Sequence, residues 1–111
     1  MVVHIKSMQD LNHNININNN SYVLKFVSHR CIGCSLLNSI IHDYTKRTIY
    51  HIDIDECPQI ADTYQIKKVP TILNVVNSQE DIRLSGFNCI MKWVKCINIS
   101  DALLTNMKMT I

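Results

Sequence analysis

Long apolar runs, a recognisable leader and an excess of charge of either sign are all missing from this sequence. No apolar stretch approaches the roughly 20 residues that a bilayer-spanning helix requires, and the first residues, Met1–Lys6, lack the layout of a signal peptide. The formal net charge of the 111 residues is only +2, and the charges are spread along the chain, which argues against a nucleic-acid or anionic-membrane surface. We therefore expect a cytoplasmic protein with neither nucleic acid nor a membrane as a partner.

Glycine is also scarce, with only two residues, and no repeat or shift in composition marks a domain boundary. Hydrophobic residues make up 47 % of the chain, which is enough for one modest core. We expect residues 1–111 to form a single domain that is a monomer or a weak dimer. The chain is rich in Ile and Asn, a bias typical of A/T-rich genomes such as those of many large DNA viruses. This bias is a hint about origin, viral or otherwise, and says nothing about chemistry.

Cysteine is present, in an odd number. Five cysteines without a leader do not fit the even-numbered disulfide framework of a small secreted domain, so we expect mostly reduced thiols and at most one working pair. The candidate pair is Cys31-Ile32-Gly33-Cys34, which follows the apolar run Tyr22–Val27 and opens a stretch with helical spacing. Since the free N–H groups at a helix start favour a thiolate, Cys31 and Cys34 are candidates for a dithiol that forms and breaks a disulfide.

Strand-like and helix-like stretches alternate along the chain, which predicts an α/β protein, and a late hairpin makes its sheet mixed. The predicted strands are Val2–Ile5, Tyr22–Val27, Ile49–Ile54, Thr71–Val76 and Asp81–Ser85. The predicted helices run from about Met8 to His13, from Cys31 to about Lys46, from Pro58 to about Tyr64, and from an N-cap at Asn88 through Ile97. Asn14–Asn20 is expected to be a surface loop, because Asn tolerates turn conformations.

This order of elements, with Cys-x-x-Cys at a strand-to-helix turn and Val69-Pro70-Thr71 ahead of the hairpin, resembles thioredoxin over nearly the whole chain. The resemblance implies a thioredoxin-like fold, with a central mixed sheet of four to five strands flanked by helices on both faces. It also implies that Cys31 is the exposed nucleophile, that Cys34 is the buried resolving thiol and that Pro70 is a cis-proline beside them. The implied activity is dithiol–disulfide exchange, which needs no cofactor.

The same resemblance implies where substrates bind and which partners supply electrons. A substrate peptide would lie in a groove whose residues surround the cysteine pair and the proline: Arg30, Ile32, Gly33, Val69 and Gly86. Protein thiols and disulfides are the implied substrates, with a thioredoxin reductase or glutathione as a further partner. The pattern does not fix whether the protein acts as a reductant or an oxidant, because the exchange is reversible.

Three of the positions that depart from the thioredoxin pattern change the charge near the cysteine pair. The family's Trp before the first cysteine is Arg30 here, which places a cation beside the nucleophile and favours its thiolate. The family's buried aspartate is Lys25, and its lysine partner is His51. Lys25 is interpreted as an ammonium that stabilises the reduced pair, as a neutral base for Cys34, or as a side chain that extends to solvent. His51 is either a hydrogen-bonded structural histidine or a catalytic group.

Other uses of the chemically active residues stay open at this point. Cys31 and Cys34 could form half of a zinc site, although no second Cys-x-x-Cys supplies the usual spacing. The further ligands of such a site would come from His29, Cys57, Cys89 or Cys96. If no zinc binds, Cys89 and Cys96 are interpreted as bystander thiols, and Cys57 as an inert cap residue of the helix at Pro58 or as a reactive thiol.

An acidic stretch and an alternative function complete the interpretation. Asp53, Asp55 and Glu56 are interpreted as a solvated strand end, although three nearby acids could hold a cation. The competing hypothesis for the whole protein is a non-enzymatic interaction module that keeps the fold and the groove but has lost turnover. The intact pair Cys31 and Cys34 argues against it.

Overall fold

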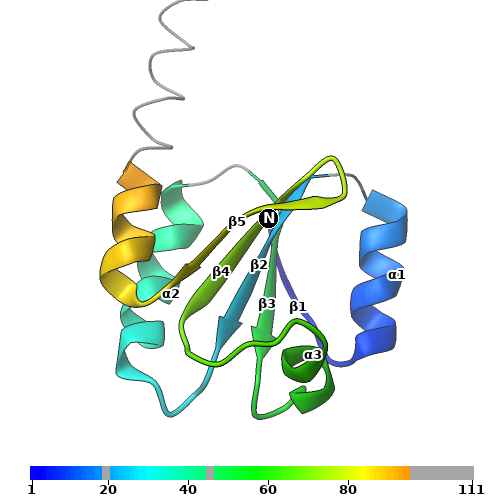
Figure 1. The fold of residues 1–111 in the computed structure, drawn as a ribbon, viewed down its shortest axis with the longest axis horizontal. Helices are drawn as coiled ribbons and strands as arrows, with labels where there is room; N and C mark the ends of the chain where they lie inside the picture. Colours follow the sequence, from blue (N-terminus) through cyan, green and yellow to red (C-terminus); the bar gives the residue numbers. More distant parts are fainter. Residues whose placement is uncertain (19–20, 45–46, 96–111) are drawn as a thin grey trace, which may run out of the picture.

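The computed structural model describes residues 1–18, 21–44 and 47–95, which form a five-stranded sheet between helices (Figure 1). The strands are β1 (Val2–His4), β2 (Tyr22–Val27), β3 (Ile49–Asp53), β4 (Thr71–Val76) and β5 (Gln79–Ser85). The helices are α1 (Met8–Asn18), α2 (Ile32–Tyr44), α3 (Pro58–Thr63) and a final helix over residues 87–95.

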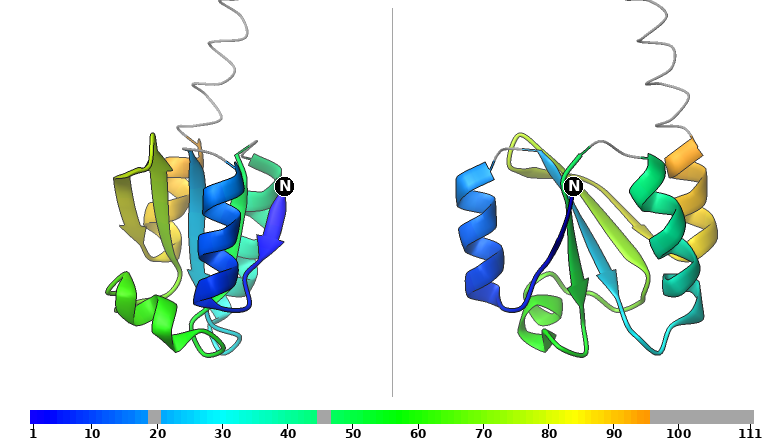
Figure 2. Two further views of the ribbon diagram at one scale, coloured as in Figure 1. Left: turned by 90° about the vertical axis from the view of Figure 1, so that its right-hand side faces the viewer. Right: turned by 180° about the vertical axis from the view of Figure 1, so that it is seen from behind.

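The sheet has the strand order β1-β3-β2-β4-β5. The three strands β1, β3 and β2 are parallel, whereas β4 runs antiparallel to β2 and forms a hairpin with β5. Helices α1 and α3 cover one face, and α2 and the final helix cover the other (Figures 1 and 2). The predicted α/β fold with a mixed sheet and helices on both faces is confirmed.

The central strand β2 is buried along its whole length because helices cover both of its faces. Leu24 and Phe26 pack on the side of α1 and α3, whereas Val23 packs on the side of α2 with Leu37. This explains why the sequence of β2 is a nearly continuous apolar run rather than an alternating one. Lys25 is the exception, because it is a cation with no exposed surface in the middle of this strand.

The loop predicted at Asn14–Asn20 is wrong over its first five residues, because α1 continues to Asn18. Leu11 is fully buried and Ile15, one turn later, packs against the same core, so the helix has an apolar face that outweighs the low helix propensity of Asn. Ser7 starts the helix as predicted, since its Oγ accepts the Asp10 backbone N–H at 3.0 Å. Residues 19–20 lie outside the described part of the chain.

The prediction that Asn88 caps the final helix is also wrong. The backbone N–H of Ile90 donates to the carbonyl oxygen of Gly86 at 3.1 Å, so the helix begins directly after Gly86 and Asn88 lies in its first turn. Gly86 has a φ of 93°, a conformation that favours glycine. Ile97 and the predicted helix end at Lys46 lie outside the described residues.

The hairpin is tighter than predicted, because Asn77 and Ser78 alone form its turn, with φ values of 52° and 65°. Positive φ at both central residues matches the right-handed twist of the paired strands, and β5 therefore starts at Gln79.

None of the described helices is both long enough and apolar enough to cross a bilayer.

Candidate dithiol site

Cys31 and Cys34 lie where β2 ends and α2 begins, at one edge of the sheet. The backbone N–H of Cys34 donates a hydrogen bond to Cys31 Sγ over 3.2 Å, so the sulfur occupies the position of a helix N-cap acceptor. Cys31 is half-buried and Cys34 is buried, and both are free thiols in this structure. The more accessible sulfur of the pair is therefore the one that a backbone N–H at the helix start contacts.

Cys34 has the opposite environment. Burial raises the pKa of its thiol to about 12, and the hydrogen bond with Cys31 acts in the same direction. A backbone hydrogen bond with Ser28 and the charge of Lys25 lower this pKa, but less strongly than burial raises it. The two thiols of the motif therefore differ, one accessible and helix-capped and the other covered and held protonated.

Lys25 lies beneath the dithiol. The interpretation that its side chain extends to solvent is therefore wrong. Its side chain has no exposed surface, and its Nζ donates a 2.9 Å hydrogen bond to Asn38 Oδ1 on α2. Burial lowers the pKa of Lys25 to about 8, and the nearby Cys34 partly offsets this effect. A cation that titrates close to neutral pH therefore lies next to the buried thiol.

The predicted groove residues from three segments lie together around Cys31. Its thiol contacts the carbonyl oxygen of Val69 at 3.7 Å, and the Val69–Pro70 peptide is cis, as predicted. The Pro70 carbonyl oxygen accepts the Gly86 N–H at 2.9 Å. On the α2 side, a methyl group on Gly33 would lie 3.8 Å from Pro70 Cδ, so helix and proline are in close contact. The geometry joins the cysteines, the cis-proline and Gly86 in one surface.

A family model described as Thioredoxin matches residues 2–98. The chain belongs to the thioredoxin family. This membership, with Cys31 and Cys34 close together, supports thiol–disulfide oxidoreductase chemistry in general terms.

Solved structures of thioredoxins share the fold. The reduced Schistosoma mansoni thioredoxin pre-protein is 17 % identical with a TM-score of 0.72, over 86 % of this chain and 97 % of that one. A mutant thioredoxin from Halobacterium salinarum is 18 % identical with a TM-score of 0.74, over 86 % and 87 %. The oxidised Plasmodium falciparum thioredoxin is 19 % identical with a TM-score of 0.72, over 86 % and 96 %. None of these comparisons bears on the A/T-rich or viral genome that the composition suggests.

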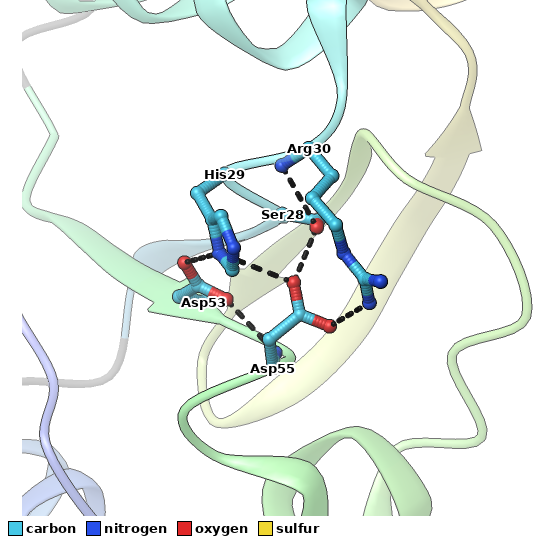
Figure 3. Close-up of polar contacts among 5 residues, drawn as sticks. All are labelled: Ser28, His29, Arg30, Asp53 and Asp55. Atoms are coloured by element: carbon cyan, nitrogen blue, oxygen red, sulfur yellow. Dashed lines mark hydrogen bonds and ion pairs between the residues drawn. The ribbon is translucent and has the colours of Figure 1, made fainter.

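Arg30, which replaces the Trp of thioredoxins, is not free beside Cys31. Its guanidinium donates to Asp55 Oδ1 at 3.0 Å, and the same carboxylate accepts a hydrogen bond from Ser28 at 2.5 Å (Figure 3). Sequence analysis missed this role of Asp55. The available clue was that β2 and β3 are parallel neighbours, so the residues that follow them meet at the same edge of the sheet.

His51, at the position of the family's lysine, lies opposite Lys25 in the register of β2 and β3. It is half-buried, and its ring lies 4.6 Å from the ring of His4 on β1, measured between centroids. The structure thus places basic side chains in a row across the sheet where thioredoxins have an acid and a base. A catalytic role of His51 stays a prediction.

The other described residues considered as metal ligands do not gather around Cys31 and Cys34. Within the described part of the chain, the one group of three close His, Cys, Asp or Glu side chains is His29, Asp53 and Asp55, which includes no cysteine. Cys57 is buried, with its thiol 3.7 Å from the carbonyl oxygen of Ile5, and burial raises its pKa. Cys89 is exposed on the final helix, and Cys96 lies outside the described residues. The described residues therefore bring no third zinc ligand to Cys31 and Cys34.

Proposed function

We propose that this protein exchanges dithiols and disulfides with protein substrates through Cys31 and Cys34. The observation that supports this proposal most is the 3.2 Å hydrogen bond from the Cys34 N–H to Cys31 Sγ at the start of α2. It places a backbone donor against an accessible sulfur, with a second thiol one helical turn inside. Such an unequal pair is what a two-step exchange requires.

In the reducing direction, the Cys31 thiolate attacks one sulfur of a substrate disulfide. The Cys31–substrate bond forms, the substrate S–S bond breaks, and the other substrate sulfur leaves as a thiolate. Cys34 then loses its proton and attacks Cys31 Sγ, which releases the second substrate sulfur and leaves a Cys31–Cys34 disulfide. Two electrons pass from the pair to the substrate, and the two substrate thiolates take up protons. The reverse sequence oxidises a substrate dithiol.

Lys25 assists the second step, in which Cys34 must become a thiolate despite a pKa of about 12. Because the pKa of Lys25 is about 8, its amine is protonated in most molecules at pH 7. This favours an ammonium that stabilises the Cys34 thiolate by charge, while the neutral fraction that grows at higher pH can accept the proton. His51, opposite Lys25 in the sheet register, is proposed as a second group that adjusts this titration.

The substrate peptide lies along Ile32, Val69-Pro70 and Gly86, with its backbone beside Val69. Ile32 is 80 % exposed, and an exposed branched side chain next to the nucleophile offers apolar contact to a partner. Arg30 and Gly33 border the same surface. A thioredoxin reductase or glutathione is proposed to restore the reduced pair. We also propose that the protein acts in the cytoplasm as a single domain and needs no cofactor.

The proposal is tested by single-turnover reduction of a disulfide-linked fluorescent peptide. Cys31→Ser is expected to abolish reduction, whereas Cys34→Ser is expected to accumulate a mixed disulfide with Cys31 that mass spectrometry detects. Cys89→Ser is the matched control, because it removes an exposed thiol on the final helix and should leave the rate unchanged. Wild-type reduction no faster than that of Cys31→Ser or of buffer alone would leave the non-enzymatic interaction module as the better account.

A further inference from the structure

Asp55 makes contact with all three residues of the segment that precedes Cys31. Its Oδ2 accepts the Ser28 hydroxyl hydrogen bond at 2.5 Å and lies 3.3 Å from His29 Nδ1, and its Oδ1 accepts from Arg30 at 3.0 Å (Figure 3). These contacts lower the pKa of Asp55, with the Ser28 hydrogen bond as the largest cause, so the group is a carboxylate at neutral pH. The Asp55 carboxylate, just beyond β3, therefore holds in place the segment that leads from β2 into α2.

Ser28 connects this carboxylate to both cysteines. Its side chain is bonded to Asp55, and its Oγ also accepts the Arg30 backbone N–H at 3.2 Å. Its carbonyl oxygen accepts the Cys31 N–H at 3.1 Å, and its backbone hydrogen bond with Cys34 lowers the pKa of that buried thiol. A shift of Ser28 would therefore disturb the support of Cys34 as well as the position of Cys31.

Arg30 is the second connection. It precedes Cys31 directly, and its guanidinium would raise the positive charge near that sulfur if it were free to turn toward it. In the structure the guanidinium is paired with Asp55, so its charge is largely balanced. Since both oxygens of Asp55 already have partners, these contacts favour a positioning role over the capture of a cation by His29, Asp53 and Asp55.

We propose that Asp55 is a positioning residue for the dithiol, which holds Ser28 in place to support Cys34 and keeps the Arg30 cation away from Cys31. The proposal rests on the proposed function, because it assigns Asp55 to the same exchange reaction. Removing the charge of Asp55 is expected to change the two cysteines in different ways, which separates this role from a general loss of stability.

The test compares Asp55→Asn with Glu56→Gln, which removes the same charge from the next, exposed residue. In the Cys34→Ser background, the midpoint of the Cys31 alkylation rate against pH is expected to fall by about half a pH unit in Asp55→Asn, the size expected for exposed charges. Glu56→Gln is expected to leave it unchanged. Adding Arg30→Gln to Asp55→Asn is expected to remove most of the shift, because the released cation is then gone.

The second readout uses the two-cysteine protein. The rate at which Cys34 resolves the mixed disulfide is expected to fall about fivefold in Asp55→Asn, the loss expected from one weakened hydrogen bond. Thermal unfolding establishes that each variant is folded, and Asp55→Glu, which keeps the charge, is expected to recover part of the rate. A folded Asp55→Asn with an unchanged midpoint and rate, or the same changes in Glu56→Gln, would overturn the proposal. Failure of the proposed function is distinct, because wild type itself would then form no Cys31–Cys34 disulfide.

Discussion

Lys25 and Asn38 are hydrogen-bonded beneath the dithiol helix, with 2.9 Å between Nζ and Oδ1. The bond joins the central strand β2 to α2 one turn beyond Cys34, at a place in the fold where the thioredoxin pattern has a buried acid. A buried cation and a buried acid act with opposite sign on a neighbouring thiolate. Besides holding α2 against β2, this contact therefore keeps a cation next to Cys34, which is expected to change the reduction potential of the cysteine pair.

The first prediction concerns the reduction potential of the Cys31–Cys34 pair in Lys25→Met. The Lys25 ammonium stabilises thiolates of the reduced form and not the uncharged disulfide, so its removal should lower the potential. A fall on the order of 10–30 mV is expected, since about 30 mV corresponds to 1.4 kcal/mol for a two-electron couple. Equilibration with glutathione buffers measures it.

Lys92→Met is the control for this experiment, because Lys92 is an exposed lysine on the final helix. It should leave the potential unchanged. An unchanged potential in Lys25→Met, together with a collapse of the resolving rate, would instead assign Lys25 the role of the base for Cys34.

The second prediction concerns the pH dependence of stability. The pKa of Lys25 falls from 10.5 to about 8 on folding, so between these values the unfolded chain binds more protons than the folded one. The cost of burying the ammonium is therefore fully present below pH 8 and is lost as the pH rises through this window. The free energy of unfolding of wild type should rise relative to Lys25→Met by on the order of 3 kcal/mol between pH 8 and 10.5.

Urea unfolding of both proteins across this range provides the measurement. In this measurement both proteins carry Cys34→Ser, because the Lys25 charge also shifts the pKa of Cys34 and that titration would not cancel between them. A difference that stays constant with pH would mean that Lys25 keeps its ordinary pKa in the folded protein.

The third prediction compares the two glycines of the chain. An added methyl at Gly33 would make only ordinary contacts, 3.8 Å from Pro70 Cδ and Phe87 Cβ, so Gly33→Ala should be neutral or stabilising by up to about 1 kcal/mol in the helix. At Gly86 a methyl meets nothing within 4 Å, but φ is +93°, so Gly86→Ala should destabilise by about 1 kcal/mol or more through backbone strain alone. Thermal unfolding of the two variants separates the cost of steric contact from the cost of backbone strain. Equal stabilities of Gly33→Ala and Gly86→Ala would contradict this prediction.

The order of strands and helices was predictable from the sequence because β2 is a short, nearly continuous apolar run and α2 has helical spacing of its apolar residues. The sequence did not decide whether the Lys25 ammonium is buried or extends to solvent, because either is compatible with one lysine in an apolar strand. The length of α1 was not predictable from propensity, because Ile15 packs against the core only when the sheet is present. The pairing of Arg30 with Asp55 was missed for a similar reason, since it depends on two parallel strands ending side by side.

A redox titration of the wild-type protein tests the central claim most directly. The protein is equilibrated in graded glutathione buffers and trapped with an alkylating reagent, and its thiols are mapped by mass spectrometry. We predict one two-electron transition in which Cys31 and Cys34 are protected together as a disulfide, with Cys57 remaining a buried thiol. A pair that stays reduced across the whole range, or one zinc ion that co-purifies with each chain, would contradict the account.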